Sequence, residues 1–169
     1  IFVQINDENL HLVRCLLDEV FGRENFVAVV AFQTAASQNT KTIPRLFDYL
    51  LWYGRDVAQL KVRSLYRDRT EGELIGTFDR LEPNGRRFKS AELKTDDELE
   101  KIRLREAGRL TEDGKYTKRY PEDFSVVRLH NVWDDTVIST YSKEKVYTVQ
   151  TNTKVIERCI LMTTDPGDL

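Results

Sequence analysis

Three apolar segments of strand composition in the first 56 residues constrain the fold most. They are "IFVQI" at 1–5, "NFVAVVAFQT" at 25–34 and "LFDYLLWYGRD" at 46–56. The first holds a single Gln among apolar residues, as in a strand covered on both faces in a parallel sheet. The other two are joined by a short polar loop, which favours an antiparallel pair at the sheet edge.

A helix is predicted between the first two segments, with Asn6 or Asp7 as its cap and Gly22 after its end. Its apolar residues recur at helical spacing at Leu10, Val13, Leu17 and Val20. In the third segment, alternation predicts that Phe47, Tyr49 and Leu51 share one face of the strand, opposite Asp48, Leu50 and Trp52.

The stretch 57–128 has weaker apolar patterning and indicates an inserted module. It contains a turn at "EPNGRR" (82–87) and a helix at 96–107, with Thr95 and Glu98 at capping-box spacing, Asp97 one turn before Lys101, and Gly108 after the end. Residues 55–120 carry 17 Lys/Arg against 14 Asp/Glu, between two acidic flanks. A basic middle can face phosphates, although a solvated face of mixed charge explains it equally well.

The last part, 129–169, is predicted as a loop with strand-like edges, a strand at 145–151 and a helix at 152–163. This helix should bury Val155, Ile156, Cys159, Ile160 and Met162. "NVWDDT" (131–136) is interpreted as a loop in which Asp134 and Asp135 make Asx-type turns.

Composition excludes several classes of protein. Cys15 and Cys159 both lie among apolar helix residues and are predicted to be core thiols, so neither a disulfide framework nor a metal site is expected. His11 and His130 are interpreted as structural. No apolar run approaches the ~20 residues of a membrane span and no secretory pattern is present, which favours a cytoplasmic protein without membrane contact.

Four stretches together resemble a known family: "IFVQINDENLHLVRCLLDEVFGRENFVAVVAFQ", "FDYLLWYGRD", "NVWDDT" and "VYTVQTNTKVIERCILMTTDPGDL". In this order and spacing they are similar to the site-specific DNA methyltransferases of the type III modification-subunit kind. The resemblance implies an α/β, Rossmann-like fold that binds S-adenosylmethionine, with an antiparallel edge hairpin. It also implies three parts: methyltransferase core at 1–56, a target-recognition insert at 57–128 and core again at 129–169.

Two motifs of that family are absent from the sequence. It has no Asp-Pro-Pro-Tyr, which grips the target amino group, and no Gly-x-Gly, which holds the cofactor. In the family the first lies upstream of "IFVQI" and the second follows "TTDPGDL". The sequence is therefore interpreted as the central part of a prokaryotic methyltransferase, and this part alone is expected to be inactive.

The resemblance places Phe47, Asp48 and Tyr49 near a base flipped out of the duplex, although ordinary sheet packing is the competing explanation for the aromatic side chains. Asn6 and Asp7 follow the first strand, where open α/β sheets bind ligands, and helix capping explains them as well.

The resemblance also places the carboxylate of S-adenosylmethionine at the start of the helix at 152–163. Helix starts attract anions through free N–H groups and the helix dipole. The candidate cofactor residues are Gln150, Thr151, Asn152 and Lys154, and capping by Thr151 or Asn152 is the alternative.

The implied reaction is methylation of adenine N6 in double-stranded DNA, beside a restriction subunit, with a homodimer left open. Cytosine N4 methylation and a non-catalytic DNA-binding module of the same fold are the rivals. Candidate phosphate contacts are the basic residues beside turns, namely Arg86, Arg87, Lys89, Lys115, Lys118 and Arg119.

Overall fold

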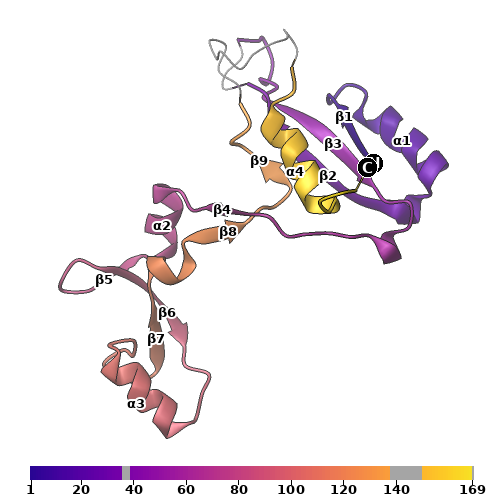
Figure 1. The fold of residues 1–169 in the computed structure, drawn as a ribbon. Coiled ribbons are helices and arrows are strands. Elements are labelled where there is room, and N and C mark those ends of the chain that lie inside the picture. The colour runs from indigo at the N-terminus through magenta and orange to yellow at the C-terminus, as the bar shows by residue number, and fades with distance from the viewer. Residues whose placement is uncertain (36–38, 138–149, 169) are drawn as a thin grey trace. The chain divides into compact units, whose positions relative to one another are not determined.

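The computed structural model describes residues 1–35, 39–137 and 150–168, which divide into two compact units (Figure 1). The first unit contains Ile1–Leu65 and Arg128–Leu169, and the second contains Tyr66–Val127. The sequence places the corresponding boundaries at 56/57 and 128/129. The role of the second unit as a target-recognition region stays a prediction.

The first unit is built on a four-stranded sheet with the order β1-β3-β2-β9. Its strands are β1 (Phe2–Ile5), β2 (Phe26–Gln33), β3 (Phe47–Tyr53) and β9 (Val132–Trp133). β3 runs antiparallel to both β1 and β2, which confirms the predicted antiparallel pair. β9 runs parallel to β2, so β1, β2 and β9 all point in one direction.

Two predictions about this sheet are wrong. The segment 1–5 is not a parallel strand covered on both faces: within the described chain β1 forms one ladder, antiparallel to β3, and its side chains are half-buried or exposed. The hairpin of β2 and β3 also lies inside the sheet and not at its edge. The reason is that β3 is apolar on both faces, with Leu50 and Leu51 both buried, and such a strand is stable only in a covered, central position.

Two helices cover opposite faces of this sheet (Figure 1). On one face, Leu50 packs with Val155 of α4 (Thr153–Thr163). On the other face, Leu51 packs with Leu17 of α1 (Leu10–Phe21). The predicted alternation along β3 is therefore confirmed for these two leucines.

Helix α1 begins and buries its residues differently from the prediction. Its N-cap is Asn9, and Asn6 only accepts a bond from the Asn9 N–H at 3.4 Å. Gly22 ends the helix with φ +86°, as predicted. Val20 and Cys15 are exposed, because Phe21 continues the stripe of α1 that packs on the sheet.

Helix α4 confirms part of its predicted core. Val155 and Cys159 are buried and Met162 packs against them. Ile156 and Ile160, predicted to be buried, are each about half exposed. The predicted strand 145–151 falls mainly outside the described residues, and its last two residues, which are described, are not in a strand.

The second unit is made of short elements. A two-stranded sheet joins β4 (Tyr66–Asp68) and β8 (Val126–Arg128), and an antiparallel three-stranded sheet has the order β5-β6-β7. The remaining bounds are β5 (Arg80–Leu81), β6 (Arg87–Glu92), β7 (Tyr116–Arg119), α2 (Glu71–Thr77) and α3 (Glu98–Glu106). Three short 3₁₀ helices are also present. They are η1 (Arg23–Asn25) and η2 (Val57–Gln59) in the first unit and η3 (Pro121–Phe124) in the second.

In the second unit the predicted turn at 82–87 is confirmed, and the predicted capping box of α3 is wrong. Gly85 has φ +83° in the β5–β6 turn, where its N–H donates to the Glu82 carbonyl at 2.8 Å. The capping box predicted for α3 is wrong: the Asp97 side chain caps the helix by accepting from the Leu99 N–H. Lys101 pairs with Glu98 at 2.7 Å and not with Asp97.

A capping box is present on α2, where Thr70 and Glu73 bond each other's backbone N–H. Gly108 follows α3 with φ +66°, as expected. Among the described helices, none has the length and apolar character of a membrane span.

Replacing Leu51 with Ala should lower the free energy of unfolding by about 2–5 kcal/mol, because its side chain is fully buried and the change leaves a cavity. Leu12→Ala is the matched control, since Leu12 is 59% exposed and should change stability by less than about 0.5 kcal/mol. Urea denaturation of both variants measures this. Equal effects would contradict the assignment of β3 to the core.

Candidate functional site

The carboxyl ends of β1, β2 and β9 share one edge of the sheet, because these strands point the same way. β3 runs in the opposite direction and therefore begins at this edge. Open α/β sheets bind ligands outside the carboxyl ends of their strands. The residues predicted to lie near the target base, at 6–7 and 47–49, are all at this edge.

Three of these predicted residues line one hollow of about 370 Å³. Asp7, Phe47 and Tyr49 contribute to its walls together with residues 42–46. Arg45 contacts Asp7 at 3.3 Å and Glu8 at 2.7 Å, so an exposed ion pair joins Arg45 and Asp7 within the lining of the hollow. Asn6 is not in the lining, since its side chain bonds the backbone ahead of α1.

Asp48 lies on the other face of β3, where it meets Gln4. The Gln4 amide Nε2 donates to Asp48 Oδ2 at 3.3 Å, and the Thr151 hydroxyl donates to Gln4 Oε1 at 2.6 Å. Gln4 is opposite Leu50 in the β1–β3 ladder, so its side chain shares a face with Asp48 two residues away. Gln4 thus connects a predicted target-base residue with a predicted cofactor residue.

Gln4 was not among the predicted site residues. The signal that could have identified it is its position as the one polar residue in the apolar segment 1–5. Gln4 is exposed, and its side-chain amide makes these two hydrogen bonds at the protein surface.

The start of α4 is bound to the end of β2 through Thr136. Asn152 caps α4, which is the alternative that the sequence left open for it, because its Oδ1 accepts from the Lys154 N–H at 2.9 Å. Its Nδ2 donates to the Thr136 carbonyl at 2.8 Å. The buried Thr136 hydroxyl donates in turn to the Gln33 carbonyl at 2.7 Å, which fixes α4 relative to the sheet edge.

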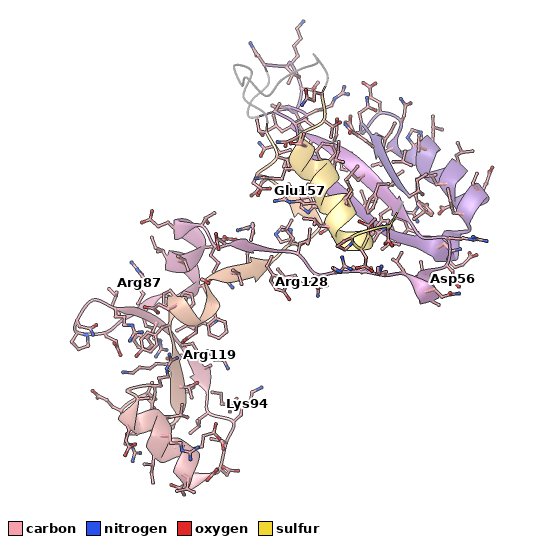
Figure 2. The ribbon with its side chains drawn as sticks, in the orientation of Figure 1. Asp56, Arg87, Lys94, Arg119, Arg128 and Glu157 are labelled. Atoms are coloured by element: carbon pink, nitrogen blue, oxygen red, sulfur yellow. The ribbon has the colours of Figure 1, made fainter. Side chains whose placement is uncertain are left out.

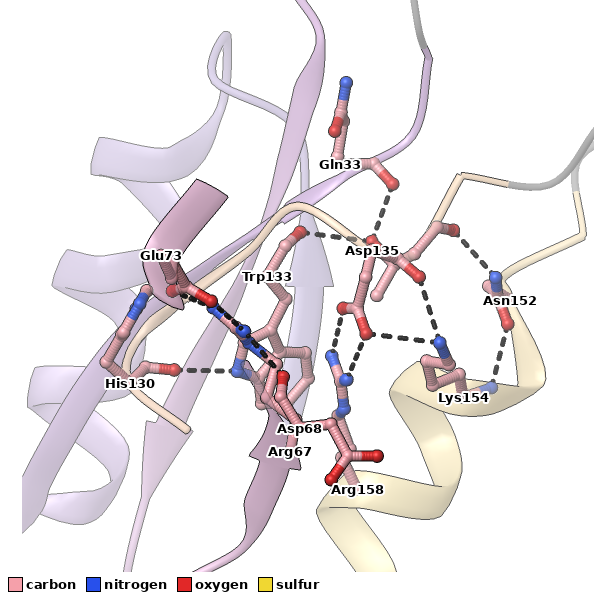
Figure 3. Close-up of polar contacts among 11 residues, drawn as sticks. Gln33, Arg67, Asp68, Glu73, His130, Trp133, Asp135, Asn152, Lys154 and Arg158 are labelled. Carbon is pink, nitrogen blue, oxygen red and sulfur yellow. Dashed lines mark hydrogen bonds and ion pairs between the residues drawn. The ribbon is translucent and has the colours of Figure 1, made fainter. Parts of the chain in front are cut away.

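Asp135 forms a two-pronged ion pair with Arg158, at 2.8 and 2.6 Å, and also accepts from the Lys154 ammonium at 3.2 Å (Figure 3). The pKa of the Asp135 carboxyl is lowered to about 2, mainly by its hydrogen bonds to the Arg158 guanidinium and to a smaller extent by Lys154. Partial burial opposes this shift by favouring the neutral carboxyl. Arg158 is only 7% exposed, and its guanidinium lies 5.1 Å from the Trp133 ring centre. The Asx-turn interpretation is therefore wrong for Asp135, whose carboxylate binds two cations of α4.

These contacts reduce the number of hydrogen-bond donors that the predicted cofactor residues can direct at a ligand. The Lys154 charge is partly neutralised by Asp135, and the Asn152 side chain is used within the chain. Thr151 is half-buried and donates its one hydroxyl hydrogen to Gln4 Oε1, so it can bind a carboxylate only by exchanging that bond, and Gln150 directly precedes it. The ammonium group and the helix start, with the Thr151 hydroxyl after that exchange, make a donor set that fits a carboxylate.

The six predicted phosphate contacts all lie in the second unit, in different surroundings. Lys118 pairs with Glu82 at 2.9 Å, and Arg86 lies 3.5 Å from Glu122 with its guanidinium 3.6 Å from the Tyr120 ring centre. Lys115 is in the turn before β7. The remaining three, on β6 and β7, are Arg87, Lys89 and Arg119. Within the described ranges no group of acidic, His or Cys side chains is arranged to hold a metal ion.

Replacing Asp135 with Asn should lower the free energy of unfolding at pH 7 by about 1–3 kcal/mol, because the buried Arg158 then lacks its counter-charge. A carboxyl whose pKa falls from ~3.9 when unfolded to about 2 when folded stabilises the protein above pH ~4. That contribution disappears as the pH falls from ~4 through 2.

Urea denaturation at several pH values measures the difference between wild type and variant, which should shrink below pH ~4. Asp134→Asn is the matched control, since Asp134 is exposed and makes no side-chain bond within the described chain. A difference between wild type and Asp135→Asn that stays constant down to pH 2.5 would contradict the ion pair.

Comparison with known proteins identifies the family to which the chain belongs. The family model described as "DNA methylase", for N6 and N4 methyltransferases, matches residues 1–169. A stretch of 57 residues, 32% of this chain, is 37% identical to the type II methyltransferase M.EcaI of Enterobacter cloacae. That stretch covers 13% of the relative's length. Because the family match extends over every residue, the chain belongs to the N6/N4 DNA methylase family.

Proposed function

We propose that the full-length protein transfers a methyl group from S-adenosylmethionine to adenine N6 in double-stranded DNA. We also propose that it acts as the modification subunit of a type III system, beside a restriction subunit, in a prokaryotic cytoplasm. The observation that carries the proposal is the Gln4 bridge, which holds Asp48 and Thr151 at one sheet edge. Family membership supplies the reaction class.

The chemistry of methyl transfer to an amine suits this edge. The sulfonium of the cofactor supplies an electrophilic methyl group, and the protein must hold the amine lone pair in line with it. The target base must also leave the duplex stack. Phe47 and Tyr49, in the hollow with Asp7, offer aromatic faces that can hold a base.

Thr151 and the start of α4 are proposed to hold the carboxylate of S-adenosylmethionine. The first-turn N–H groups of a helix carry partial positive charge, and the hydroxyl precedes them by two residues. Lys154 adds a weaker contribution than its charge implies, because Asp135 binds its ammonium group.

Two rival functions remain distinct proposals. Cytosine N4 methylation uses the same donor and the same kind of acceptor, and the family model includes both reactions. A non-catalytic DNA-binding module of the same fold is the second rival, and it would lack Asp-Pro-Pro-Tyr and Gly-x-Gly, which in the family lie outside these 169 residues.

Incubation of the full-length protein with S-adenosylmethionine labelled in the methyl group and mixed-sequence duplex DNA tests all three functions. After digestion to nucleosides, label in N6-methyladenine supports the proposal. Label in N4-methylcytosine supports the first rival. DNA binding without any label in either nucleoside supports the module.

Replacing Thr151 with Ala in the full-length protein should weaken S-adenosylmethionine binding by about one to two orders of magnitude, as expected for a lost bond to a charged group. Calorimetric titration measures the affinity, and a thermal melt of the same sample measures stability. Thr153→Ala is the matched control, since Thr153 is exposed and its hydroxyl makes no bond within the described chain. If both variants bind the cofactor like wild type, Thr151 only supports Gln4.

A further inference from the structure

Two basic residues lie directly opposite each other on β6 and β7 of the second unit. The antiparallel register pairs Lys89 with Arg119. Opposed residues on neighbouring strands have Cβ atoms about 4.5–5.5 Å apart, and like charges in this position destabilise a sheet. Arg119 is exposed and Lys89 is half-buried, and Figure 2 labels Arg119 on the second unit.

Lys118, the neighbouring basic residue on β7, differs from Lys89 and Arg119 because a carboxylate of the protein binds it. Lys118 faces the opposite side of the sheet, because it comes one residue before Arg119 on β7. Its ammonium donates to Glu82 at 2.9 Å, and the Tyr120 hydroxyl donates to the same carboxylate at 2.9 Å. Lys118 therefore has a counter-charge within the protein.

Lys89 and Arg119 have no such counter-charge: none of the described carboxylates lies within ion-pair distance of either one. Both lie over the Phe124 ring instead, with the Lys89 ammonium 5.2 Å and the Arg119 guanidinium 5.6 Å from its centre. An aromatic face attracts cations but carries no net charge, so it positions the two groups without cancelling their repulsion.

We propose that Lys89 and Arg119 form an anion site for a phosphate of duplex DNA. This proposal rests on the proposed function and assigns the DNA contact of the second unit to one face of its three-stranded sheet. Arg119 offers a planar fork that suits two phosphate oxygens, and Lys89 adds a point charge. The phosphate supplies the counter-charge that the second unit provides to Lys118 but not to this pair.

A row of charge on this face favours a nucleic-acid backbone over a single small ion. Arg87 is two residues before Lys89 on β6, so it lies on the same face about 6.6–6.8 Å away along the strand. Among the described residues, its side chain makes one hydrogen bond, a long one of 3.4 Å to the Phe78 carbonyl. Lys118 and Arg86, by contrast, are held by Glu82 and Tyr120 and are assigned to the structure of the unit.

The test compares two double variants of the full-length protein, each lacking two positive charges. Lys89→Gln with Arg119→Gln removes the proposed site, and Lys101→Gln with Arg105→Gln removes equal charge from α3. Fluorescence anisotropy with a labelled duplex, at several salt concentrations, gives the affinity and its salt dependence. Thermal melts of the same samples give stability.

The site variant should bind duplex DNA about tenfold more weakly or worse, with a slope of log affinity against log salt that is smaller by about 0.9 for one lost phosphate. Its melting temperature should not fall, because the change removes a repulsion. The α3 variant should bind within about twofold of wild type.

Site-variant affinity and salt slope equal to those of wild type would overturn the anion site and leave the proposed function intact. A lowered melting temperature together with weak binding would also overturn it, since the pair would then support the fold. Wild-type protein that binds no duplex even at low salt would instead refute the proposed function itself.

Discussion

Strand β3 is the constraint on which the first unit depends. Leu50 and Leu51 are consecutive residues, so they point to opposite faces of the sheet, and both are buried. A strand of this kind requires cover on both faces and a hydrogen-bonded neighbour on both edges. α4 and α1 provide the cover, and β1 and β2 provide the neighbours.

The position of the candidate site follows from this arrangement. Because β3 runs against its neighbours, its first residues lie beside the last residues of β1 and β2. Asp48 therefore meets Gln4, while Tyr49 points to the opposite face and lines the hollow with Asp7. One reversed strand thus brings the aromatic hollow and the Gln4 hydrogen bonds to the same end of the sheet.

Local features of the fold could be predicted from the sequence, and long-range pairings could not. The extents of β2, β3 and α4 and the turn at Gly85 follow from short-range periodicity and glycine conformation. The antiparallel partner of β1 lies more than 40 residues away, and an apolar strand does not specify its direction. The pair of Asp135 with Arg158 joins residues 23 apart, and no motif spacing predicts it.

Helix α4 combines support of the fold with part of the candidate site, but on different residues. Its buried side chains and Arg158 attach it to the sheet and to Asp135, so changes there alter stability and the position of the helix start together. Thr151 lies outside the helix and contacts only Gln4 through its hydroxyl, among the bonds within the described chain. Asp135 binds both Arg158 and Lys154, so one positive charge of this group stays uncompensated beside the backbone N–H groups of the helix start. The proposed carboxylate site therefore depends on the placement of α4, which positions both its backbone N–H groups and Lys154.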